Sequence, residues 1–284
     1  MKERLRSIAA LLVPVLAAVL LFLPYVVSGE RFFCGPTTFF PPWSPPAAPS
    51  TRTYDMDVTD QAVFMWPNYD HWKKSVRGDV DGLFWNPDHL CGTPFLATQD
   101  TYALYPANGF ALLGDGTDVF AWTAFVHVLI AGLGGYALLR RTGAGAAAAG
   151  IGGAAFAAGS WMVAHFDYPN FPQAAAWFPW VIFAADRATT LRRHRDRALL
   201  ALSVAISCYA GMIQLTVASL LTAGLWSLVR SLGTLRAEGA GAAVRGLVSA
   251  LAGVVCGLLL AAPQLLPLFD YASSGDRMKA SRDD

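Results

Sequence analysis

The sequence predicts an all-α polytopic membrane protein, with about seven transmembrane helices and a large first extracytoplasmic loop. The 284 residues are 55% hydrophobic and only 14% charged. Their mean hydropathy of +0.41 is too high for an ordinary soluble domain. Long apolar runs recur along the chain, and lysines and arginines gather in alternate connecting segments. The net charge of +1, without a basic tract, gives no indication of nucleic-acid binding.

Seven runs are candidates for membrane spans, because a helix needs about 20 apolar residues to cross a hydrocarbon core of roughly 30 Å. The fourth run is short and carries Asp186 and Arg187 near one end. Only a tight turn near Gly211–Gln214 separates the fifth run from the sixth. The predicted spans are Ile8–Val27, Asp118–Leu139, Gly143–Val163, Gln173–Thr189, Ala198–Gln214, Leu215–Leu232 and Gly246–Leu268.

The first run has a second interpretation as a secretory signal peptide, because Lys2, Arg4 and Arg6 precede it. Its apolar part is longer than the roughly 7–15 residues of a signal peptide, and six more runs follow. We therefore expect a retained helix. The third run is rich in glycine and alanine, which predicts close packing of helix backbones at the centre of the bundle.

The orientation follows from the lysines and arginines, which are enriched in cytoplasmic connections. With the N-terminus inside, the basic residues that flank the predicted spans on that side are all inside, and the connection His165–Pro172, which has no Lys or Arg, is outside. The basic residues concerned are Lys2, Arg4, Arg6, Arg140, Arg141, Arg192, Arg193, Arg195, Arg197, Arg236 and Arg245. The chain then divides into a first helix (1–27), an extracytoplasmic acidic loop (28–117), a six-helix bundle (118–268) and an extracytoplasmic tail (269–284).

Ionisable residues are scarce within the predicted spans. His127 is the only one well inside its span, whereas Asp186 and Arg187 are expected to reach the interface. Ion and proton pathways usually carry such residues, because charge inside a bilayer is costly. Their scarcity argues against a transporter and directs attention to the outside loop.

The loop between Ser28 and Thr117 has ten acidic and five basic residues, a formal charge of −5. Its cluster Asp55, Asp57 and Asp60 has two interpretations. One is solvation and capping of a helix that begins at Gln61, and the spacing alone favours it. The other is a catalytic base or a divalent-metal ligand. Helical periodicity in the segment 59–75 is weak, and Pro67 is expected to break it.

Aromatic residues and cysteines in the loop also leave alternatives open. Its tryptophans Trp43, Trp66, Trp72 and Trp85 fit an interfacial aromatic belt or a surface on which sugar rings stack. Cys34 and Cys91 can pair if the loop is extracytoplasmic, but the spacing of the four cysteines does not predict a metal site.

Several short patterns, taken in order, resemble the bacterial YfhO-like membrane proteins, which are related to the C-type membrane glycosyltransferases. The resemblance runs over nearly the whole chain, but Met212 stands where the family pattern has His. The matching elements are Asp57–Gln61 or Asp60–Gln61, Leu83–Ala97, Tyr105–Pro106, Arg140–Arg141, His165–Arg187, Gly211–Gln214 and Ala262–Pro267.

The resemblance implies a C-type hexosyltransferase in the bacterial cytoplasmic (inner) membrane. Such enzymes take a sugar from a polyprenyl-phosphate donor on the outer side, and an acidic residue of the first outside loop acts as base or binds metal. On this basis Asp57 is expected to be the catalytic residue, with Asp60 second, and Asp55 and Asp57 are expected to be ligands of a divalent cation, Mg or Mn. Gln61, Trp85 and Asn86 would shape the sugar site, and Lys73, Lys74 and Arg77 would offset the donor phosphate.

Two further functions stay open. Family members usually continue through more membrane helices, so a truncated, non-catalytic relative that assists envelope assembly is one alternative. A transporter or flippase is the other, and the scarcity of charge within the spans disfavours it. For the enzyme, the acceptor would be an envelope polymer or a glycolipid, so the expected partners are membrane lipid, a lipid-linked sugar and a glycan.

Overall fold

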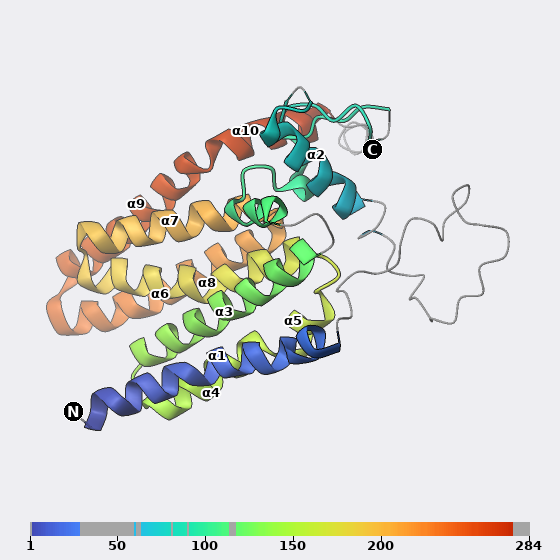
Figure 1. Ribbon diagram of the computed structural model, residues 1–284. Helices are drawn as coiled ribbons and strands as arrows, with labels where there is room; N and C mark the ends of the chain where they lie inside the picture. Colours follow the sequence, from blue (N-terminus) through green and yellow to red (C-terminus); the bar gives the residue numbers. More distant parts are fainter. Residues whose placement is uncertain are drawn as a thin grey trace, which may run out of the picture.

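The structure, a computed structural model, describes residues 2–28, 60, 64–80, 82–89, 91–113 and 118–274. Throughout this part of the chain the regular elements are helices, and the one β-bridge joins Asn86 to Thr93. Figure 1 shows a long bundle with the N-terminus at one end and α2 (Trp66–Arg77) at the other. The sequence-based prediction of an all-α protein is confirmed.

The bundle is built from long helices that run back and forth between its two ends (Figure 1). One end carries the turns rich in arginine and is called the arginine end. The other carries the acidic loop and is called the loop end. The helices are α1 (Lys2–Ser28), α3 (Asp118–Arg141), α4 (Ala146–Ala157), α5 (Ser160–Ala164), α6 (Asn170–Leu191), α7 (His194–Tyr209), α8 (Ile213–Glu238), α9 (Ala240–Leu260) and α10 (Ala262–Ser274).

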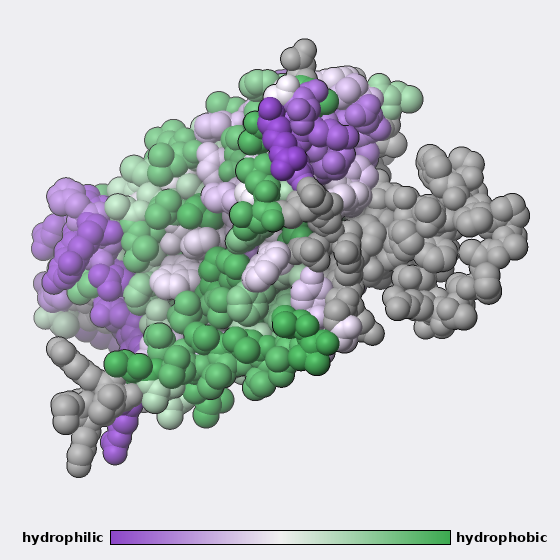
Figure 2. All heavy atoms as spheres, viewed as in Figure 1, coloured by the Kyte–Doolittle hydropathy of each residue, from purple (hydrophilic) through white to green (hydrophobic). Residues whose placement is uncertain are grey.

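Five helical stretches of the described chain are long and apolar enough to cross a membrane. Figure 2 shows apolar side chains along the flank of the bundle and hydrophilic ones at its two ends, as expected of such a protein. These features suggest a membrane protein. The five stretches are Arg6–Ser28, Val119–Arg141, Ala146–Ala164, Ile213–Glu238 and Ala240–Leu260.

The other two predicted spans, Gln173–Thr189 and Ala198–Gln214, correspond to α6 and α7. Both form helices, but neither meets the same test of length and hydropathy. Helix α7 has 16 residues, about 24 Å at 1.5 Å per residue. Helix α6 packs against α3, α7, α8 and α9 and buries most of its side chains, so little of it requires a lipid-facing apolar surface.

Two predicted boundaries were wrong. The predicted span Gly246–Leu268 is two helices, because α9 ends at Leu260 and α10 begins at Ala262. The break precedes Pro263, which has no N–H to continue the ladder of hydrogen bonds. Pro67 does not break a helix either. It lies in the first turn of α2, where proline is favoured because that turn's N–H groups have no intrahelical partner.

Small residues bring α1, α3 and α4 together, as the glycine and alanine content of the third run predicted, but α4 lies at the edge of the bundle against α1 and α3 and not at its centre (Figure 1). A Cβ added at Gly153 of α4 would lie 2.5 Å from the carbonyl oxygen of Gly132 in α3. One added at Gly150 would collide with the carbonyl oxygen of Ala10 in α1. The backbones approach so closely that no larger side chain fits between them.

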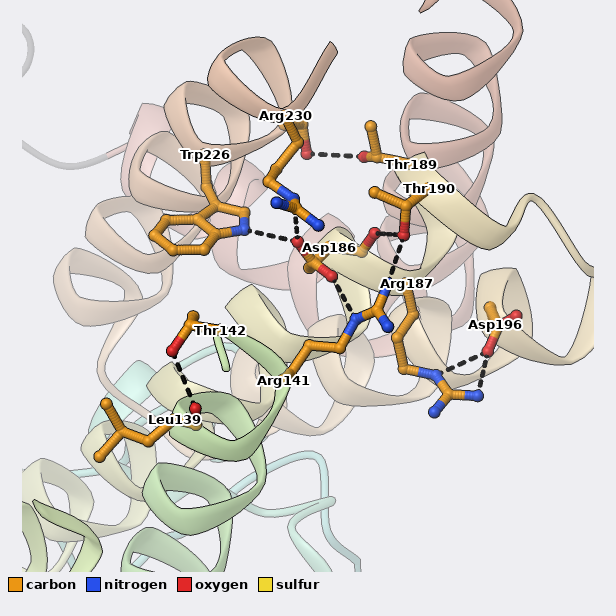
Figure 3. Close-up of polar contacts among 11 residues, drawn as sticks. Leu139, Arg141, Thr142, Asp186, Arg187, Thr189, Thr190, Asp196, Trp226 and Arg230 are labelled. Carbon is orange, nitrogen blue, oxygen red and sulfur yellow. Dashed lines mark hydrogen bonds and ion pairs between the residues drawn. The ribbon is translucent and has the colours of Figure 1, made fainter. Parts of the chain in front are cut away.

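Asp186 was expected to reach the interface, but it is buried near the arginine end of α6, with 1% of its surface exposed. Its carboxylate accepts hydrogen bonds from Arg141 of α3 (2.6 Å) and from Trp226 of α8 (3.0 Å) (Figure 3). Arg230 of α8 forms an ion pair with it at 2.7 Å. Buried charges are tolerated when paired, so this carboxylate connects three helices rather than facing solvent.

Candidate functional site

At the loop end, the acidic loop packs on the ends of the bundle helices, and an open cavity of about 840 Å³ lies between them. Its wall comes from the residues before α2, from the short 3₁₀ helix η3 (Gln99–Thr101), from the start of α6 and from the turn between α7 and α8. The lining residues are Asp60, Phe64, Met65, His89, Gln99, Asp100, Tyr168, Asn170, Phe171, Met212 and Gln214.

Two carboxylates, Asp60 and Asp100, line this cavity. Asp60 is exposed, whereas Asp100 is partly buried and its Oδ1 accepts a hydrogen bond from Asn170 Nδ2 at 3.2 Å. Burial raises the pKa of the Asp100 carboxyl above its ordinary value, and the negative charge of Asp60 raises it further, while the hydrogen bond from Asn170 opposes this shift. The cavity therefore combines one accessible carboxylate with one that holds its proton more tightly.

Amide side chains connect η3 to the turn between α7 and α8. Gln99 Nε2 donates to the carbonyl oxygen of Gly211 (3.0 Å) and to Gln214 Oε1 (3.3 Å). Asn170 Nδ2 donates to the same Gly211 oxygen at 3.4 Å. Asn170 is 2% exposed, and its Oδ1 has no hydrogen-bond partner. A buried amide oxygen without a partner costs free energy. A hydrogen-bond donor or a cation bound in the cavity would supply the missing partner.

Aromatic residues support the loop beneath the cavity. Tyr102 packs edge-on against Tyr69, 5.5 Å between ring centroids, and its hydroxyl donates to Met65 Sδ, which lines the cavity. Trp72 is buried and donates to the carbonyl oxygen of Ala103 at 2.7 Å. Trp72 is thus a core residue of the folded loop, not part of an interfacial belt.

His127 of α3 lies in a buried chain of hydrogen-bonded side chains. Its Nδ1 donates to the carbonyl oxygen of Thr123 (2.6 Å), because a carbonyl can only accept. In the neutral ring Nε2 is then an acceptor, and it accepts a hydrogen bond from the Tyr105 hydroxyl, with 2.5 Å between the oxygen and the nitrogen. Trp177 in turn donates to the Tyr105 oxygen at 2.9 Å. The three side chains satisfy one another within the bundle.

The residues predicted for the site are distributed unevenly. Asp60 lines the cavity. Asp55, Asp57, Gln61 and Cys34 lie outside the described residues, so their predicted roles, including a Cys34–Cys91 pair, stay predictions.

Trp85 and Asn86 lie in the described loop but do not line the cavity. Trp85 is half exposed and covers Gly92, where an added Cβ would meet its ring at 2.5 Å. Asn86 is buried, and its Oδ1 accepts the backbone N–H of Asp88. This asparagine stabilises the local turn.

The predicted phosphate-binding cations Lys73, Lys74 and Arg77 belong to α2, and none of them lines the cavity. Lys74 forms an exposed ion pair with Asp70 at 2.6 Å, and this hydrogen bond raises the pKa of the lysine. Within the described residues, no group of three or more His, Cys, Asp or Glu side chains is placed to hold a metal ion.

The sequence-based prediction missed Asp100, Asn170 and Gln99 as site residues. Asp100 was one of ten loop acids with no distinguishing spacing. The signals that point to the site were the glycine turn between two apolar runs and the Pro169–Asn170 step at the start of α6. Comparisons with protein-family models, curated proteins and solved structures find no match for this chain.

Proposed function

We propose that the protein is a membrane glycosyltransferase that transfers a sugar from a polyprenyl-phosphate donor to an envelope polymer or glycolipid at the loop end. The observation that carries the proposal is the cavity of about 840 Å³, where Asp60, Asp100 and the amide side chains of Gln99, Asn170 and Gln214 lie together at the junction of the loop and the helices. This position allows a lipid-linked donor to approach from the membrane and an acceptor to approach from the aqueous side.

In the proposed reaction, an acceptor hydroxyl attacks the anomeric carbon of the donor sugar, and the bond from that carbon to the phosphate oxygen breaks. The proton of the hydroxyl passes to Asp60, whose exposed carboxylate is accessible to it. Asp100, the second carboxylate of the cavity, contacts the sugar beside Asp60. Positive charge develops on the sugar in the transition state, and carboxylates that face it are stabilising.

The leaving phosphate requires positive charge, and the cations of α2 do not line the cavity. Asp100 and the unpartnered Asn170 Oδ1 supply oxygen ligands of the kind that a divalent cation such as Mg or Mn prefers, which leaves Asp60 free to act as the base. A cation bound there would supply charge that stabilises the leaving phosphate.

The test is sugar transfer by the full chain in liposomes, with synthetic polyprenyl-phosphate hexoses as donors and a glycolipid acceptor. Asp60→Asn should lower the rate by about 10²–10⁴-fold, the usual contribution of general-base catalysis. Asp79→Asn is the matched control, because Asp79 is an exposed loop carboxylate that does not line the cavity. Asp57→Asn, measured in parallel, tests the first-ranked residue of the sequence-based hypothesis. Transfer by Asp60→Asn at the wild-type rate would overturn the assignment of the base.

A further inference from the structure

A second, separate cavity of about 470 Å³ lies between α8 and α9, and α6 and α7 form its floor. Leu228 of α8 and Val248 and Leu251 of α9 lie at its mouth and are 53%, 58% and 61% exposed. The lining is apolar except for Ser227. In a membrane this mouth faces lipid, and an apolar groove of this kind accepts an acyl chain.

Arginines border the groove where it approaches the arginine end. Arg230 follows Ser227 by three residues along α8, and Arg245 precedes Val248 by three residues along α9. Residues three apart lie on the same face of a helix, so both arginines lie on the helix faces that line the groove. They lie one helical turn beyond the apolar lining, where a lipid headgroup would lie.

The charge at this place is not neutralised by the protein. Arg245 is exposed and forms no ion pair with any described residue. Arg230 shares the single carboxylate of Asp186 with Arg141, so that these three residues carry a formal charge of +1 (Figure 3). Arg230 is also 43% exposed, which leaves part of its guanidinium available to a ligand.

We infer that this groove is a binding site for an anionic phospholipid. One acyl chain lies between α8 and α9, and the phosphate of the headgroup contacts Arg230 and Arg245. Basic pockets between membrane helices bind anionic headgroups in this way. Charge complementarity selects the occupant, because a zwitterionic phospholipid offers the same chains but no net charge. The site lies on the part of the bundle away from the acidic cavity and does not depend on the proposed transferase activity.

The chain allows a closely matched test. Gly224 lines the groove and Gly233 does not, yet both are exposed residues of α8, and an added Cβ would meet nothing within 4 Å at either position. Gly224→Leu therefore places a side chain in the groove from a position where the Cβ itself has room, and Gly233→Leu makes the same change elsewhere on the helix. Arg245→Gln removes one charge from the site, with Arg195→Gln as its control, because Arg195, at the start of α7, is exposed and forms no ion pair with a described residue.

Lipid binding is measured by native mass spectrometry of the full chain, with phosphatidylglycerol and phosphatidylcholine of identical acyl chains as probes. The wild type should prefer phosphatidylglycerol. Arg245→Gln should lower the affinity for phosphatidylglycerol by about fivefold, the effect of one arginine at an anionic surface. Gly224→Leu should lower the binding of both lipids, and both control variants should bind like the wild type. Equal binding of the two lipids by the wild type, or unchanged binding by Gly224→Leu, would overturn the inference.

Discussion

At the scale of single residues, Asp100 has the most unusual environment of the described loop carboxylates. Its carboxyl is partly buried, accepts a hydrogen bond from Asn170 and lines the same cavity as Asp60. Burial and the neighbouring charge raise its pKa above the ordinary value of 3.8. A carboxyl of this kind keeps its proton in the folded protein at a pH where the unfolded chain has lost it.

This shift predicts a pH-dependent stability. Because the folded state binds the proton more tightly, the contribution of Asp100 is favourable below its unfolded pKa and is lost as the pH rises through its raised folded pKa. Asp100→Asn cannot titrate, so its melting temperature relative to the wild type should rise from acid to neutral pH. Asp79→Asn, at an exposed loop carboxylate, should show no such trend. A difference for Asp100→Asn that stays constant or falls with rising pH would contradict the assigned environment.

Sequence reasoning singled out Asp60, which lines the cavity, but not Asp100 or Asn170, which also line it. Asp60 belongs to an acidic cluster that is visible in the sequence, whereas Asp100 differs from the other loop acids only by its burial. Desolvation depends on how the loop packs against the start of α6 and the turn after α7, which lie about 70 and 110 residues further along the chain. Local spacing carries no information about such contacts.

At the scale of elements, the turn between α7 and α8 holds the loop against the bundle. Gly211 has a φ of +80°, and an added Cβ would lie 2.8 Å from the Tyr102 ring and 2.9 Å from the carbonyl oxygen of Gln99. The turn thus requires glycine for two reasons, backbone conformation and space. The sequence showed a tight turn here but not that the loop packs on it.

Gly211→Ala should destabilise the protein more than Gly143→Ala. Gly143 also has a positive φ (+96°), but an added Cβ meets nothing within 4 Å there. Both changes incur the left-handed backbone penalty of about 1–2 kcal/mol, and only Gly211→Ala adds a collision with the loop. Thermal unfolding of both variants measures the difference. Equal melting temperatures of the two variants would show that the loop does not contact this turn closely.

Other element boundaries were less predictable than the helices themselves. Long apolar runs predicted the helices well, because a helix that is buried in lipid or in a bundle needs apolar residues in every turn. The break at Ala261 and the start of α2 at Trp66 depend on Pro263 and Pro67. A proline fits the first turn of a helix but interrupts its middle, and the apolar pattern alone does not distinguish these positions.

At the scale of the whole molecule, the number of membrane spans decides on which side of the membrane each connecting segment lies. If α6 and α7 cross the membrane along with the five apolar stretches, the acidic loop and the connection between α6 and α7 lie on opposite sides. A cysteine placed by Asp79→Cys in the loop and one placed by Arg195→Cys at the start of α7, each in a background without native cysteines, should react with an impermeant maleimide from opposite faces of sealed vesicles. Labelling of both from one face would show that α6 and α7 do not cross.

A double-mutant cycle on sugar transfer is the decisive measurement of whether Asp60 and Asp100 act together on one substrate, as proposed. The cycle compares kcat/KM for the wild type, Asp60→Asn, Asp100→Asn and the double variant. Side chains that act as a unit give strongly non-additive losses. We expect each single variant to lose activity. The kcat/KM of the double variant should be only slightly below that of the less active single variant. Wild-type activity in both single variants, or losses that add in free energy, would contradict it.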